Sequence, residues 1–256
     1  MITTTAISKG KPNILVGNRN FRQDIGAQVT SLINTHFSGT IGKMGTDITK
    51  YILAQIQGES SFNYNKPGPH YPASHIRKVL TYSAVNSAYA NGDQFLRSNI
   101  INSIRALGLM QVTGYYLIKG AGPNGIAELS RMRGDLWNSK IVSPGTDVTS
   151  LLTGEANIST QLLAGLTVLE DKYKIGLRLN HPGYPDLFSY TFGTYLGTGR
   201  DSLGTTPAVY VQRIFGSNFK IANGEGAFSP NVDTTKTTGP IVTAASGKNL
   251  GIPGCA

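Results

Sequence analysis

A helical stretch that ends in one isolated carboxylate constrains this chain more than any other feature. Within residues 46–62, apolar side chains recur at the spacing of a helix with one buried face: Ile48, Tyr51, Ile52 and Ile56. Thr46 or Asp47 can cap the start of this helix, and Gly58 loosens it near its end. The pattern predicts a buried helix whose last residues lie at the edge of the core.

Glu59 follows directly and is the only acidic residue between Asp47 and Asp93. Its neighbours are apolar or small, so the end of a buried helix would deprive its carboxyl of water. Loss of solvation favours the protonated carboxyl, which is the form that a general acid for glycoside cleavage needs. The other interpretation is an ordinary solvent-exposed glutamate, since isolated glutamates are usually exposed.

A second motif lies downstream, at residues 106–111. Glu-Ser-x-Phe followed by Ala-x-Gly-Leu-Met-Gln resembles the lytic transglycosylases of the soluble-lytic-transglycosylase (SLT) type, which are relatives of goose-type lysozyme. The matching residues are Glu59, Ser60 and Phe62 in the first motif, and Ala106, Gly108, Leu109, Met110 and Gln111 in the second. The resemblance covers roughly residues 44–215, or about two thirds of the chain.

This resemblance implies a mainly α, lysozyme-like helical domain that cleaves the MurNAc–GlcNAc β-1,4 bond of peptidoglycan. It implies Glu59 as the single general acid and base, 1,6-anhydroMurNAc ends as products, and neither a cofactor nor a metal. The substrate-binding residues that it implies are Ser60, Met110, Gln111 and Tyr190. The Gln111 amide can donate to and accept from N-acetyl groups, whereas Met110 fits a core position equally well.

The chain also departs from the family pattern. Tyr190 and Gly193 match an Ala-Tyr-Asn-x-Gly motif of the family, but Thr191 replaces its Asn. The two main motifs, which usually lie closer together, are separated by an insertion at about residues 63–102 that is expected to contain a helix. A hydrolytic lysozyme or endolysin on the same fold is the near alternative. It would need a carboxylate to position water, and Asp93 is the first acid after Glu59.

The remaining pattern predicts one domain with flexible ends. We expect an N-terminal tail at residues 1–23, a helical domain at 24–222 and a flexible, Gly-, Thr- and Ser-rich tail at 223–256. Trp137 fits either a sugar platform or a core anchor, and the core is favoured. Further helices are expected at about 25–38, 73–91, 93–104, 126–132, 155–173, 185–195 and 206–216, with a turn that becomes helical at 108–118 and a loop at 134–150.

Composition limits the partners. The chain of 256 residues has a net charge of +9, which favours a polyanion such as the acidic bacterial wall. The basic residues are spread out, so no nucleic acid is expected, and no apolar run is long enough to span a membrane. Cys255 is the only cysteine, so an intrachain disulfide is impossible. The histidines lack the spacing of a metal site.

The sequence also suggests a setting. No signal peptide is recognisable at the N-terminus, although peptidoglycan lies outside the cytoplasm. We therefore expect an enzyme of a phage virion tail that acts in the host periplasm, with the termini bound to tail or baseplate proteins. Delivery by a specialised bacterial secretion system is the alternative. A different class of function is a structural tail or docking component with a degenerate site.

Overall fold

The computed structural model describes residues 19–70, 99, 103–182, 184 and 186–195. Most of these residues are helical, which confirms the mainly α expectation. The α-helices are α1 (Arg19–Leu32), α2 (Ile48–Ser60), α6 (Glu128–Trp137), α7 (Thr149–Leu152), α8 (Ile158–Leu179) and α9 (Leu187–Gly193). Short π or 3-10 turns are η1 (Ile33–Phe37), η2 (Ile41–Met44), η3 (Gly114–Leu117), η4 (Pro123–Gly125), η5 (Asn138–Lys140) and η6 (Glu155–Asn157).

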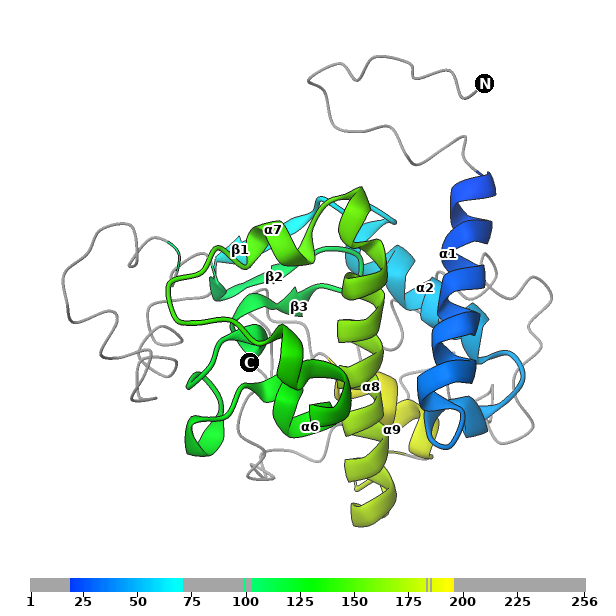
Figure 1. The fold of residues 1–256 in the computed structure, drawn as a ribbon. Coiled ribbons are helices and arrows are strands. Elements are labelled where there is room, and N and C mark those ends of the chain that lie inside the picture. The colour runs from blue at the N-terminus through cyan, green and yellow to red at the C-terminus, as the bar shows by residue number, and fades with distance from the viewer. Residues whose placement is uncertain (1–18, 71–98, 100–102, 183, 185, 196–256) are drawn as a thin grey trace.

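The long helix α8 occupies the middle of the described part of the molecule (Figure 1). The pair α1 and α2 lies on one side of it, and α6 with the small sheet lies on the other. The predicted apolar stripe of this helix is buried as expected: Ile158, Leu162, Leu166, Leu169 and Tyr173. α8 extends beyond the predicted range and ends where Asn180 adopts a left-handed conformation, with φ of 56°.

α1 begins at Arg19, inside the segment predicted to be a tail. It packs against α2 through Ile25 and Val29, which are fully buried. α2 begins where its periodicity predicts and continues past Gly58 to Ser60, so it includes Glu59, and the predicted apolar face is buried. Asp47 is its N-cap residue, but the carboxylate makes no capping hydrogen bond and instead pairs with Lys50 at 2.9 Å.

A three-stranded antiparallel sheet explains how the chain tolerates its insertion. Its strands are β1 (Pro67–His70), β2 (Arg105–Leu107) and β3 (Val112–Thr113), in that order. Pro67 pairs with Leu107, so the chain that leaves at β1 returns beside it at β2. Because the entropy of closing a loop grows slowly with its length, the inserted segment can be long without separating the motifs. Residues 71–98, where a helix is predicted, lie outside the described residues.

The segment at 108–118 matches the expectation in part. Residues 108–111 form a turn and Gly114–Leu117 form a short 3-10 helix, η3, but the strand β3 lies between them. Leu107 pairs with Val112 across the turn formed by residues 108–111. The left-handed conformation of Gln111, with φ of 50°, turns the chain back along β2. In β3, the hydrogen bonds of a strand partner therefore replace those of a helix.

The loop predicted at 134–150 begins later than expected, because α6 continues to Trp137. Trp137 is fully buried, and its Nε1 donates to the Thr167 hydroxyl of α8 at 2.9 Å. The core interpretation of Trp137 is therefore correct. The predicted helix at 206–216 and both predicted tails, apart from residues 19–23, lie outside the described residues.

A network of charges joins the second half of α8 to the rest of the fold. Buried Glu170 accepts from the Arg133 guanidinium at 2.9 Å, from the Thr40 hydroxyl at 2.7 Å and from Lys174 at 3.1 Å. Arg133 also donates to the His36 carbonyl at 3.0 Å. These contacts connect α6, α8 and the segment after α1, so the buried carboxylate is fully paired.

Candidate active site

The C-terminal end of α2 presents Glu59 at a half-buried position. Ser60 comes next and is buried, and its hydroxyl donates to the Ile56 carbonyl at 3.1 Å. Ser61 and Phe62 then adopt left-handed conformations, with φ of 54° and 62°. This double turn ends the helix and directs the chain away from its axis, so Glu59 lies at the boundary between helix and loop.

The second motif forms the turn between β2 and β3, residues 108–111, which we call the Gly108–Gln111 turn. Gly108 has φ of 70°, and a Cβ there would lie 2.3 Å from the Leu152 carbonyl oxygen. Only glycine fits this position, for conformational and steric reasons. The glycine of the motif is thus explained by the close approach of the loop that leads to α8.

Hydrogen bonds tie this turn to the loop that follows Glu59. The Lys66 carbonyl accepts from the Gly108 N–H at 2.9 Å and from the Gln111 side-chain amide at 3.0 Å. The same amide donates to the Gly108 carbonyl at 2.8 Å. The structure therefore places the second motif against Lys66, which lies seven residues after Glu59, although most of the insertion separates them in the chain.

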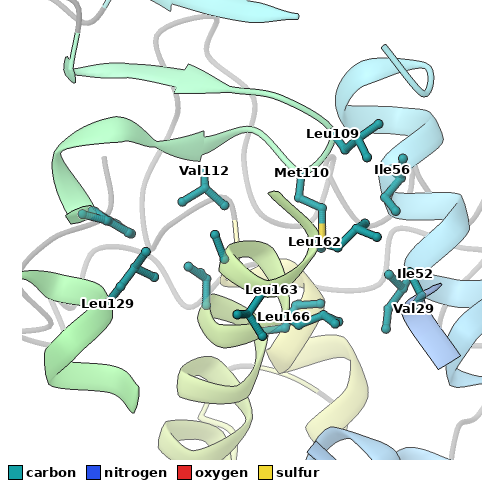
Figure 2. Close-up of a cluster of buried hydrophobic side chains, with 14 of the residues drawn as sticks. Val29, Ile52, Ile56, Leu109, Met110, Val112, Leu129, Leu162, Leu163 and Leu166 are labelled. Carbon is teal, nitrogen blue, oxygen red and sulfur yellow. The ribbon is translucent and has the colours of Figure 1, made fainter. Parts of the chain in front are cut away.

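α8 holds the Gly108–Gln111 turn in place through a hydrogen bond and through packing. The Gln161 side chain accepts from the Leu109 N–H at 2.9 Å and donates to the Gly154 carbonyl at 3.0 Å. The Met110 side chain is fully buried and points at α8, next to Leu162 (Figure 2). A Cβ at Gly165 would lie 2.2 Å from its sulfur. In this conformation Met110 is a core residue with no surface to offer a sugar.

The two tyrosines near the end of the described chain have different surroundings. The Tyr190 ring is buried against Gly176 and Tyr184, and its hydroxyl has no hydrogen-bond partner within the described part of the chain. Burial raises the pKa of Tyr190. Tyr195 is half-buried, and its hydroxyl donates to the Met110 carbonyl at 2.6 Å. Of the two, Tyr195 is therefore the one with a hydrogen bond to the Gly108–Gln111 turn.

Backbone strain concentrates in this region. Six non-glycine residues of the described chain have positive φ, and three of them are Ser61, Phe62 and Gln111. Left-handed conformations are uncommon for residues other than glycine, asparagine and aspartate, and strained residues persist where the surrounding structure holds them, often at functional sites. The clustering marks the Glu59 region as a candidate active site independently of the motifs.

Two cations lie at the end of α2. The Lys66 ammonium donates to the main-chain carbonyl of Glu59. Arg22 of α1 donates to the Gln57 side chain at 2.9 Å, and its guanidinium lies 4.9 Å from the centre of the Phe62 ring. The sequence shows only apolar and small residues around Glu59, so these cations are brought to it by tertiary structure.

Three residues of the site were not anticipated from the sequence: Lys66, Gln161 and Tyr195. Gln161 carries a weak signal, as a polar residue inside the apolar stripe of α8. Tyr195 lies in the same aromatic run as Tyr190, so its presence is visible but its role is not. Lys66 follows no periodicity, and no local pattern indicates it.

Within the described residues, no group of three or more His, Cys, Asp or Glu side chains could hold a metal ion. In that same part of the chain, none of the helices is long and apolar enough to cross a bilayer. Comparisons of the chain with protein-family models, with curated proteins and with solved structures found no significant match.

Proposed function

We propose that the protein is a peptidoglycan lytic transglycosylase with a lysozyme-like fold, in which Glu59 is the general acid and base. The observation that carries the proposal is the hydrogen-bonded junction between the loop after Glu59 and the Gly108–Gln111 turn. The resemblance to SLT-type enzymes rests on these two motifs. The junction supports the proposal because it places the second motif next to the loop that continues from the first, across the insertion.

The chemistry of the proposal needs one carboxyl group. Glu59 protonates the glycosidic oxygen while the MurNAc acetamide assists at the anomeric carbon, and the GlcNAc leaves with the donated proton. The Glu59 carboxylate then takes the proton of the sugar's 6-hydroxyl, whose oxygen closes the 1,6-anhydro ring. The carboxyl is regenerated, and no water is consumed.

The other site residues have supporting roles in this proposal. Ser60 and Gln111 already direct their donor groups to main-chain carbonyls. They therefore set the geometry of the helix end and the turn. Tyr195 fixes the Met110 carbonyl, whereas the family resemblance implies that Tyr190 makes a hydrogen bond near Glu59 and helps to orient the substrate. The net charge of +9 adds general attraction to the acidic wall.

Product analysis tests the reaction type. Mass spectrometry of purified murein digested with the protein should show 1,6-anhydro-muropeptides, which are lighter by one water than the products of a hydrolase. Reducing MurNAc ends as the main product would instead establish the hydrolytic lysozyme alternative and leave the role of Glu59 intact. Asp93, the acid considered for that alternative, lies outside the described residues.

The virion-tail setting and the tail or baseplate partners are proposed from the sequence. Purified phage particles should contain the protein, and their murein-degrading activity should be lost when Glu59 is replaced. Presence of the protein in lysed-cell supernatants only, and never in particles, would contradict this setting. Delivery through a bacterial secretion system predicts instead that strains lacking that system retain the protein inside the cell.

A further inference from the structure

At the C-terminal end of α2, a lysine side chain caps one of the last carbonyl groups, and no glycine forms the cap. The last carbonyl groups of a helix need donors from outside it. The Ser61 N–H donates to the Gln57 carbonyl at 3.0 Å, and the Asn63 N–H donates to the Ser60 carbonyl at 3.0 Å. The Glu59 carbonyl accepts from the Lys66 ammonium instead. The positively charged ammonium of Lys66 therefore caps the C-terminal end of α2 at the carbonyl of Glu59, the proposed acid.

The main chain of Lys66 serves the other motif. Its carbonyl accepts from both Gly108 and Gln111, as described above, and its N–H donates to the Asn63 carbonyl at 3.1 Å. Lys66 thus contacts the helix end through its side chain and the Gly108–Gln111 turn through its backbone. A change in the position of this one residue would alter the spacing between the two motifs.

Building on the proposed function, we propose that Lys66 is a positioning residue for Glu59. Its ammonium fixes the main chain of the acid, while its carbonyl holds the turn at a constant distance. A cation at a helix C-terminus is also favourable, because the last carbonyl groups of the helix carry partial negative charge.

Two substitutions at Lys66 test whether the positive charge of its side chain is needed. Lys66→Met keeps the length of the side chain and removes the ammonium, whereas Lys66→Arg keeps a cation. We expect kcat on murein to fall about tenfold or more in Lys66→Met, with a smaller change in KM, and Lys66→Arg to recover most of the loss. Lys50→Met is the matched control, since Lys50 lies on the same helix in an exposed pair with Asp47, and it should remain fully active.

Hydrogen exchange tests the contact without relying on activity. In Lys66→Met the Gln111 side-chain amide and the Gly108 N–H should exchange about tenfold faster than in the parent protein, and Lys66→Arg should restore their protection. Unchanged exchange in folded Lys66→Met would overturn the positioning role, as would full activity of that variant. If exchange responds as expected but the parent protein does not digest murein, the contact stands and the proposed function fails.

Discussion

The two halves of α8 hold their polar neighbours by different means. Near its start, Gln161 binds the Gly108–Gln111 turn through neutral hydrogen bonds, and the chain around it contains left-handed residues. Nine residues further on, roughly 14 Å along the helix axis, Glu170 is buried among Arg133, Lys174 and Thr40.

This difference matches the division that we propose between a catalytic site and a region that stabilises the fold. Charges that are paired and buried resist change, because removal of one leaves the other without compensation. A carboxyl that must give up and take back a proton needs a setting in which both of its forms are tolerated. The fully paired carboxylate of Glu170 does not meet that need.

The sharpest test of the comparison is Glu59→Gln, which keeps the shape of the side chain and removes its proton. Murein digestion should fall by about a hundredfold or more, the usual scale for a lost general acid, while the melting temperature stays close to that of the parent. Glu155→Gln makes the same chemical change at an exposed position and should retain activity. Comparable clearing rates for the two variants would refute the assignment of Glu59.

In the second half of α8, the test is the network around Glu170. Arg133→Met should lower the free energy of unfolding by about 3 kcal/mol, because Glu170 stays buried after losing its closest cation. Lys174→Met removes an exposed partner of the same carboxylate and should cost less than about 1 kcal/mol. Urea denaturation measures both. Equal losses would show that exposure does not decide the contribution of these ion pairs, and the contrast between the two halves of α8 would weaken.

Gly165→Ala should destabilise the protein by about 1–3 kcal/mol and reduce activity, because the new methyl group would overlap the Met110 side chain beneath the turn. Gly26→Ala is the control, since its Cβ would meet only Leu53, at 3.4 Å, inside a helix where alanine is favoured. It should be neutral or stabilising. Thermal unfolding and murein digestion, measured on both variants, decide whether packing under the turn matters for function.

The smallest expected effect distinguishes the two tyrosines. Tyr195→Phe removes a hydrogen bond to the Met110 carbonyl and should cost about 1 kcal/mol of stability together with part of the activity. Tyr190→Phe removes a buried hydroxyl that lacks a partner, so it should be neutral or slightly stabilising. The family resemblance predicts instead that Tyr190→Phe loses activity. A large loss in that variant with none in Tyr195→Phe would favour the motif alignment over the geometry.

The sequence by itself determined the buried faces of α2 and α8, because their signals are local. The apolar residues of α2 and α8 recur every three or four positions, and each side chain needs only its neighbours along the chain to reveal which face is buried. Glu59 could be singled out in the same way, as an isolated acid at the end of such a helix. The position of Met110 was open, since its side chain fits a core or a sugar-binding surface equally well, whereas for Trp137 the core was already favoured.

Only the tertiary structure decided what holds the Gly108–Gln111 turn. Lys66, Gln161 and Tyr195 make hydrogen bonds to residues of this turn that lie far from them along the chain, and such contacts have no period. The pairing of β1 with β2 closes the insertion, and the left-handed Gln111 places a short strand, β3, before the expected helical segment. Both outcomes depend on partners that a local pattern does not contain, because a hydrogen bond requires proximity in space and not in sequence.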